Sequence, residues 1–129
     1  YGYQYAASLL TDKAASDLTA LMWKNRCINL CIYSLLDTGI HYQGWNQTAA
    51  LRFLQVFGIR DTKIASEIYQ YIVETPCNYL KYYLGYLNFL DLKKKQQEKS
   101  GSSFDVREFH RKVLTIGPVQ FPVLEKYMQ

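Results

Sequence analysis

Histidine and cysteine are scarce in this sequence. Its 129 residues include two histidines, His41 and His110, which lie far apart, and three cysteines. Structural and catalytic zinc sites need three or four histidine, cysteine or carboxylate ligands, usually at short spacings along the chain. The sequence therefore predicts no metal site built from this chain alone.

The cysteines predict no disulfide either. Cys27 and Cys31 are four residues apart in a segment with helical spacing, where the backbone separation suits disulfide geometry poorly. Cys77 is the third cysteine, so the three cannot all pair within the chain. We expect three reduced, mostly buried thiols.

Long apolar runs and two-residue alternation of apolar residues are absent as well. A membrane-spanning helix needs about 20 consecutive apolar residues, so we expect no membrane-spanning segment. Apolar residues instead recur at helical spacing throughout the 129 residues. The pattern predicts an all-α fold, an irregular multi-helix bundle in a single domain over residues 1–129.

Positive charge is in modest excess. The formal net charge is +4, and the lysines gather in the segment KKKQQEK at residues 93–99. Proteins that follow a phosphate backbone interleave cations with aromatic rings, whereas the tyrosines of this chain lie elsewhere. We expect no nucleic-acid partner.

The first long helix is expected to begin at Ser16 or Asp17, which are good N-cap residues. It should end near residues 37–45, where two glycines loosen the chain. Trp45 and Phe121 are expected in the core. The predicted buried side of this helix consists of Leu18, Leu21, Met22, Ile28, Cys31, Ile32, Leu35 and Leu36.

Later helices have clear capping signals. Asn46, Asp61 and Asp105 each precede an amphipathic segment, and side-chain oxygens of this kind accept hydrogen bonds from the first free N–H groups. Thr75 followed by Pro76 predicts the start of a long central helix over about residues 76–99.

Four tyrosines lie in the first part of that central helix. Residues three, four and seven apart share one side of a helix, so Tyr79, Tyr82, Tyr83 and Tyr86 form one tyrosine face. Leucines occupy another side, which predicts a helix buried nearly all round. Each tyrosine could simply pack with its hydroxyl on a backbone carbonyl, or one could contact a substrate.

Three segments resemble one family of bacterial proteins. They are LLDTGIHYQGW at 35–45, PCNYLKYYLGYL at 76–87 and FDVREFHRKVLTIGPVQFPVLEKYM at 104–128. Their order and spacing are similar to those in the C-terminal part of the proteins catalogued as domain of unknown function 885, which resemble zinc-dependent peptidases of the zincin type. The resemblance implies the C-terminal subdomain of a zincin-like helical protein, and we expect this chain to be part of a longer one.

In that family an H-E-x-x-P-G-H motif and an E-G-W-A segment supply the zinc ligands and the catalytic glutamate. Neither motif occurs in this sequence. The resemblance therefore implies zinc in the intact protein, no cofactor in this chain, and no hydrolysis by this chain alone.

The resemblance also implies candidate catalytic residues, because peptide hydrolysis needs a donor that stabilises the oxyanion. Aligning Pro76 and Gly85 with the family's P-x(5)-Y-x-x-G pattern places Tyr82 at the motif tyrosine, with Tyr83 as the alternative one helical step away. His41 is the third candidate.

Asp37, Tyr79 and Tyr86 are expected to contact substrate. His41 has a second interpretation, as a histidine at a helix end that bonds the last carbonyl groups. Asp37 could orient His41 or simply end the helix beside it. His110 is more readily explained as a packed or surface residue of its helix.

Two functions remain open from the sequence. One is the helical part of a zinc peptidase that borders the cleft for a peptide substrate; the other is a non-catalytic helical module that binds a peptide or protein. The expected partners are a peptide substrate, the N-terminal part of the same protein, and a second copy bound through an exposed apolar face. A bacterial protein of this kind could be cytoplasmic, exported or lipid-anchored.

Overall fold

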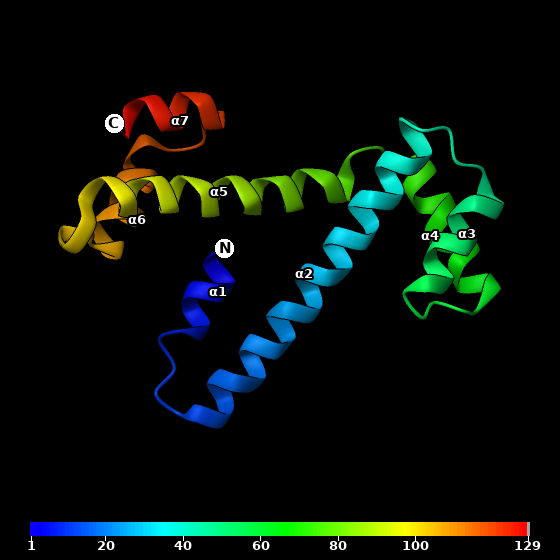
Figure 1. The fold of residues 1–129 in the computed structure, drawn as a ribbon, viewed down its shortest axis with the longest axis horizontal. Coiled ribbons are helices and arrows are strands. Elements are labelled where there is room, and N and C mark those ends of the chain that lie inside the picture. Colours follow the sequence, from blue (N-terminus) through cyan, green and yellow to red (C-terminus); the bar gives the residue numbers. More distant parts are fainter. Residues whose placement is uncertain (129) are drawn as a thin grey trace. The chain divides into compact units, whose positions relative to one another are not determined.

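The computed structural model describes residues 1–128, and every side chain among them except that of Tyr3. Seven α-helices and one short 3-10 helix account for the regular structure in this part of the chain, which contains no strand (Figure 1). The all-α prediction is confirmed. The helices are α1 (Gly2–Ala7), α2 (Lys13–His41), α3 (Gln47–Val56), α4 (Thr62–Glu74), α5 (Asn78–Ser100), the 3-10 helix η1 (Gly101–Ser103), α6 (Val106–Ile116) and α7 (Phe121–Tyr127).

The chain forms two compact units, Tyr1–Leu84 and Gly85–Gln129. In the first unit, α2, α3 and α4 pack against one another, and α1 packs along α2. Trp45 lies partly buried against the core of this unit, which confirms its predicted place. The core consists of Ile32, Leu36, Ala50, Leu54, Ala65 and Ile72.

Three of the predicted caps are confirmed. The side chains of Asn46, Asp61 and Asp105 accept hydrogen bonds from backbone N–H groups in the first turns of α3, α4 and α6. Each cap satisfies a donor that has no partner within its own helix. These residues fix where the three helices begin.

The predicted start of the first long helix is wrong. Asp12, and neither Ser16 nor Asp17, caps α2, because its side chain accepts a 2.7 Å hydrogen bond from the N–H of Ala15. Asp17 lies inside the first turns, where its carboxylate is 3.6 Å from the ammonium group of Lys13. The i,i+4 pairing of these two side chains favours continuing the helix through both positions.

The predicted buried side of α2 is also wrong for most of its residues. Ile32 and Leu36 are buried, but five others are exposed, and Trp23 is buried in their place. Because α1 packs along α2, part of the helix buries a different side from the one predicted. The five exposed residues are Leu18, Leu21, Met22, Ile28 and Leu35.

The junction between α4 and α5 differs from the prediction too. Thr75 is the C-cap of α4, where its hydroxyl donates a 2.6 Å hydrogen bond to the carbonyl of Tyr71. Cys77 has a φ of 61°, which breaks the helical path, so α5 begins at Asn78 and not at Pro76. Cys77 is exposed in this turn, against the expectation of a buried thiol, whereas Cys27 and Cys31 are half-buried.

The prediction of a central helix buried nearly all round is wrong. Among the described residues of α5, only Leu92 is buried, while Leu84 and Leu87 are exposed. The helix nevertheless runs without interruption from Asn78 to Ser100, close to the predicted range.

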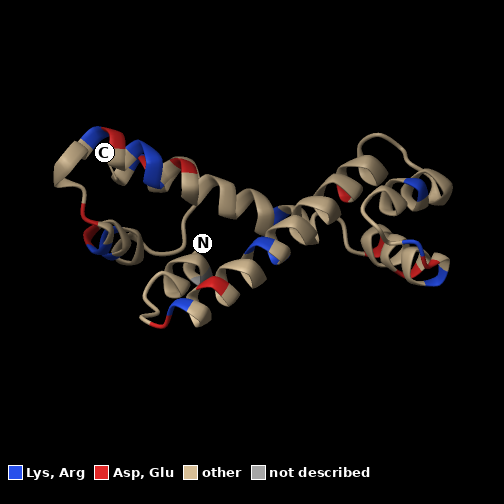
Figure 2. Ribbon diagram, turned by 60° about the horizontal axis from the view of Figure 1, so that its bottom comes forward, with Lys and Arg blue, Asp and Glu red and all other residues tan. Residues whose placement is uncertain are grey.

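The second unit has its own small core. Leu92, Phe109, Leu124 and Met128 are buried, and the ring of Phe121 meets that of Phe89 at 5.0 Å between centroids. The C-terminal half of α5 carries both acidic and basic residues (Figure 2). The ammonium group of Lys95 binds Asp91 at 2.9 Å and Glu125 of α7 at 2.8 Å, and these hydrogen bonds raise the pKa of Lys95.

No helix among the described residues has both the length and the apolar character required to cross a membrane.

Candidate functional site

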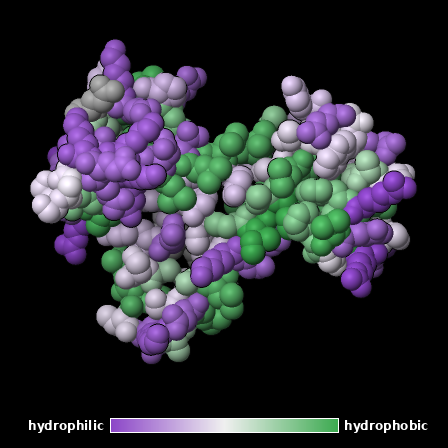
Figure 3. Space-filling view, viewed as in Figure 1, coloured by the Kyte–Doolittle hydropathy of each residue, from purple (hydrophilic) through white to green (hydrophobic). Residues whose placement is uncertain are grey.

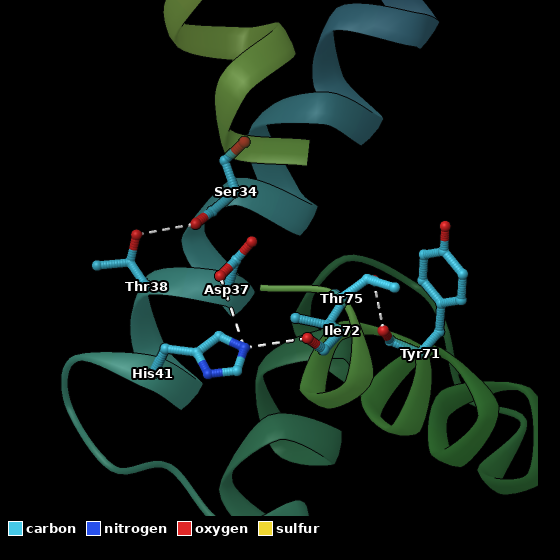
Figure 4. Close-up of polar contacts among 7 residues, drawn as sticks. All are labelled: Ser34, Asp37, Thr38, His41, Tyr71, Ile72 and Thr75. Carbon is cyan, nitrogen blue, oxygen red and sulfur yellow. Dashed lines mark hydrogen bonds and ion pairs between the residues drawn. The ribbon is translucent and has the colours of Figure 1, made fainter. Parts of the chain in front are cut away.

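A histidine and a carboxylate meet at the end of α2, where α4 also ends (Figure 4). The Nε2 atom of His41 lies 3.0 Å from the carbonyl oxygen of Ile72 and 3.8 Å from Oδ1 of Asp37. Asp37 and His41 are four residues apart, so helical geometry alone brings their side chains together. The contact with Ile72 adds an anchor from a second helix.

The carbonyl contact decides which ring nitrogen of His41 carries a proton. The oxygen of Ile72 can only accept a hydrogen bond, so Nε2 carries the proton and donates it. A neutral imidazole then has an acceptor at Nδ1, and only the cationic ring has a second N–H to donate. His41 does bond a carbonyl at a helix end, as one of its two interpretations predicted, but the helix is α4 and not its own.

Asp37, a predicted member of the site, is buried. Its side chain is 2% exposed, and its Oδ2 atom has no hydrogen-bond partner among the described residues. A buried carboxyl oxygen without a partner costs free energy, so such an atom in a folded protein calls for an explanation. Because Asp37 is buried, it is better placed to position His41 than to contact a substrate. The predicted substrate contact of Asp37 stays a prediction.

Hydroxyl groups support the helix ends around this pair. Ser34 and Thr38 donate to the carbonyl groups one turn earlier in α2, at 2.6 and 2.9 Å, and Thr75 does the same at the end of α4. Each hydroxyl group therefore has a hydrogen-bond partner in the preceding turn of its own helix. His41 is the side chain whose polar contact joins α2 to α4 here, and Asp37 contacts His41 within α2.

The loop after α2 is fixed by an indole ring. The backbone N–H of Trp45 donates a 2.9 Å hydrogen bond to the carbonyl of Gly39, and a Cβ atom at residue 39 would clash with Cε3 of the Trp45 indole. The indole also meets the ring of Phe53 at 5.3 Å. The close approach to Gly39 holds the loop beside His41.

The four predicted tyrosines have different surroundings. Tyr82 is exposed over 59% of its surface, whereas Tyr79, Tyr83 and Tyr86 are half-buried. The ammonium group of Lys81 lies 5.3 Å from the ring centroid of Tyr82. No hydrogen bond joins Tyr82 to His41 in the described part of the chain, so these two candidates are not brought into direct contact.

Tyr79 belongs to a cluster that the sequence analysis did not identify. Its ring lies 4.8 Å from that of Tyr33 and 6.0 Å from that of Tyr71, measured between centroids. Burial raises the pKa of Tyr79, and the neighbouring phenols of Tyr71 and Tyr33 raise it further. The sequence did not point to Tyr33, or to Glu67, which lines the same pocket. The residues that meet here come from three separate helices, α2, α4 and α5.

These tyrosines line a pocket of about 330 Å³ within the first unit. It lies between α2, α4 and the first turn of α5. Its lining residues are Tyr33, Ile64, Glu67, Ile68, Tyr71 and Tyr79.

The candidate Tyr86 belongs to the second unit. His110, predicted to be a packed or surface residue, is half-buried on α6 of the same unit. Burial lowers the pKa of His110, and the charge of Lys93 lowers it further. The described residues contain no group of three or more histidine, cysteine, aspartate or glutamate side chains that could hold a metal ion.

Comparison with known proteins agrees with the three segments described above. Residues 16–128 match the family described as bacterial protein of unknown function (DUF885), and the chain belongs to that family. The search of curated proteins found no match. The search of solved structures found none either.

Proposed function

We propose that this chain forms the C-terminal helical segment of a bacterial zinc-dependent peptidase of the zincin type, where it borders the substrate cleft. Support comes from its membership of DUF885 over residues 16–128. The zincin-type chemistry is what the resemblance of the three sequence segments implies. In this proposal the substrate is a peptide, and the chain packs against the preceding part of the same protein.

The residues of this chain do not fit a zinc site. The Nε2 atom of His41 is occupied by the carbonyl of Ile72, and the carboxyl group of Asp37 is buried. The zinc ligands would come from other parts of the protein, and no role that we assign to this chain depends on direct contact with the metal.

The observation that carries the proposal is the exposure of Tyr82. A hydroxyl that stabilises an oxyanion must reach the reacting carbonyl, and Tyr82 is the exposed member of the tyrosine face. Lys81 beside its ring adds positive charge near the site where negative charge develops. We therefore assign Tyr82 as the oxyanion donor, ahead of Tyr83.

His41 has a narrower role in this proposal. Its Nε2 is bonded to the carbonyl of Ile72, so Nδ1 is the ring nitrogen left to contact a substrate group. Asp37 holds the ring in place from the buried side. Tyr79 and Tyr86 contact substrate through their rings.

The test compares this chain with a longer form of the protein, extended toward the N-terminus through any H-E-x-x-x-x-H segment of its gene. We expect bound zinc and peptide hydrolysis only in the longer form. There, Tyr82→Phe should lower kcat about a hundredfold or more, the usual effect of removing one oxyanion donor, and leave the zinc content unchanged.

Tyr83→Phe is the matched control, since it removes the neighbouring hydroxyl, and it should retain most of the activity. If the longer form binds no zinc and cleaves no peptide, the second function gains support. The chain would then act as a non-catalytic helical module that binds peptides through its tyrosines.

A further inference from the structure

The pocket between α2, α4 and α5 combines three phenol rings with one carboxylate. Tyr33, Tyr71 and Tyr79 come from the three different helices, and their rings are tilted by 50° and 57° to one another. Tilted rings from separate elements form a concave aromatic surface. At about 330 Å³ the pocket is at the small end of the range for ligand sites, enough for a compact group.

A polar contact positions one of the three rings. The hydroxyl of Tyr71 accepts a 3.2 Å hydrogen bond from the side-chain amide of Asn78, which fixes one ring at the start of α5. The raised pKa of Tyr79 keeps its phenol neutral at physiological pH. Ile64 and Ile68 supply the apolar part of the lining.

Glu67 gives the pocket its charge. It is the carboxylate among the six lining residues, and it forms no ion pair with another described residue. Lys63, one turn earlier in α4, borders a neighbouring hollow that Glu67 also lines, but the two side chains are not paired. The carboxylate is therefore available to a ligand.

We infer that this pocket binds an organic cation, of the size of a trimethylammonium or guanidinium group. Ring faces attract a cation within about 6 Å of their centroids, and the carboxylate at the edge adds an opposite charge. An anionic ligand would meet Glu67 and the negative faces of the rings, and a neutral apolar ligand would leave Glu67 unpaired. The pocket shares Tyr79 with the proposed substrate contacts, but it is lined by residues of this chain alone and does not depend on zinc or on hydrolysis.

The experiment titrates the 129-residue chain with choline and, separately, with 3,3-dimethyl-1-butanol, its neutral counterpart of nearly the same shape. Nuclear magnetic resonance of the tyrosine rings reports binding at constant ionic strength. We expect saturable shifts of tyrosine resonances with choline and much weaker ones with the alcohol. Equal binding of the two compounds would overturn the inference, because the pocket would then select shape and apolar surface alone.

Two variants locate the site. Glu67→Gln should weaken choline binding by about fivefold, which corresponds to about 1 kcal/mol for a partly exposed contact with a cation. Glu67 is exposed, so the substitution should leave the fold intact. Glu98→Gln removes the same charge from a residue of α5 that does not line the pocket, and it should leave binding unchanged. If the two variants behave alike, or if choline shifts no tyrosine resonance, the site does not exist.

Discussion

Gly39 and Trp45 set the geometry of the loop after α2 through one close contact. The indole ring occupies the space that a side chain at residue 39 would need. Both residues lie in a segment that also holds Asp37 and His41, so the packing of one ring affects the position of the histidine. A substitution at residue 39 therefore tests the loop directly.

Gly39→Ala should destabilise the first unit by about 1–3 kcal/mol, the usual cost of overpacking a core. The added Cβ would clash with a ring carbon of Trp45, so the indole has to move. Urea unfolding followed by tryptophan fluorescence measures the effect.

Gly85→Ala is the matched control. Gly85 lies within α5, and a Cβ there meets no atom within 4 Å, so alanine should stabilise the helix by about 0.5–1 kcal/mol. The packing of Trp45 on Gly39 is refuted if both substitutions shift the unfolding midpoint in the same direction.

The Asp37–His41 pair shows which side-chain contacts can be predicted from this sequence and which cannot. Their proximity followed from i,i+4 spacing, and the bond from a histidine to a helix-end carbonyl was one of two interpretations. The acceptor could not be predicted, because Ile72 is distant in sequence and only the packing of α4 on α2 brings its carbonyl to the ring. For the same reason, Tyr33 and Glu67 could not be associated with Tyr79.

At the level of helices, the starts of α3, α4 and α6 were predicted correctly from their capping side chains. The start of α2 was placed too late, because Ser16 and Asp17 have the same capping chemistry as Asp12. The start of α5 was not predicted correctly, because the left-handed turn that precedes it is made by Cys77, and cysteine carries no signal for positive φ. The exposed sides of α2 and α5 were misjudged because apolar spacing predicts which residues share a face, but not which face finds a partner.

Helix α6 contains a histidine whose titration should affect stability. The pKa of His110 is lowered by burial and by Lys93, so the folded protein disfavours the charged ring. Below pH 6.5, the ordinary value, the unfolded chain therefore binds more protons than the folded one, and the free energy of unfolding falls as the pH decreases.

We expect His110→Gln to reduce this acid-side loss of stability while changing stability little at neutral pH. Urea unfolding of both proteins at pH 7.5 and at about pH 5.5 measures the difference, with far-ultraviolet circular dichroism as the signal. His41→Gln serves as the comparison on the other unit. An unchanged pH dependence in the His110 variant would contradict the assigned cause.

At the level of the whole molecule, the family match spans residues from both compact units, so membership of DUF885 is a property of the chain and not of one unit. Hydrophobic side chains are visible on the surface of the first unit (Figure 3). On α2, Leu21, Ile28 and Leu35 recur every seventh residue and share one side of the helix, and all three are exposed. An exposed apolar stripe of this kind on a monomer signals a contact surface.

We therefore expect the 129-residue chain to associate with itself through this stripe when it is prepared alone. Burying one leucine or isoleucine side chain contributes about 1.5–3 kcal/mol, so two or three such residues on each copy suffice for a measurable dimer. Sedimentation velocity over a wide range of protein concentration should show the transition. Leu21→Lys and Ile28→Lys should each shift it to higher concentration, because either change places a charge in the contact.

Leu114→Lys is the control, since Leu114 is an exposed leucine on α6, outside the stripe. A chain that stays monomeric at every concentration, or a Leu114 variant that dissociates as readily as the α2 variants, would show that this stripe does not bind a second copy. In the proposed longer form of the protein, the preceding part should cover the stripe. The same lysine substitutions should then lower the free energy of unfolding and leave the degree of self-association unchanged. An effect on stability indicates a surface that packs against the rest of the same protein, and an effect on association indicates a surface that binds a separate partner.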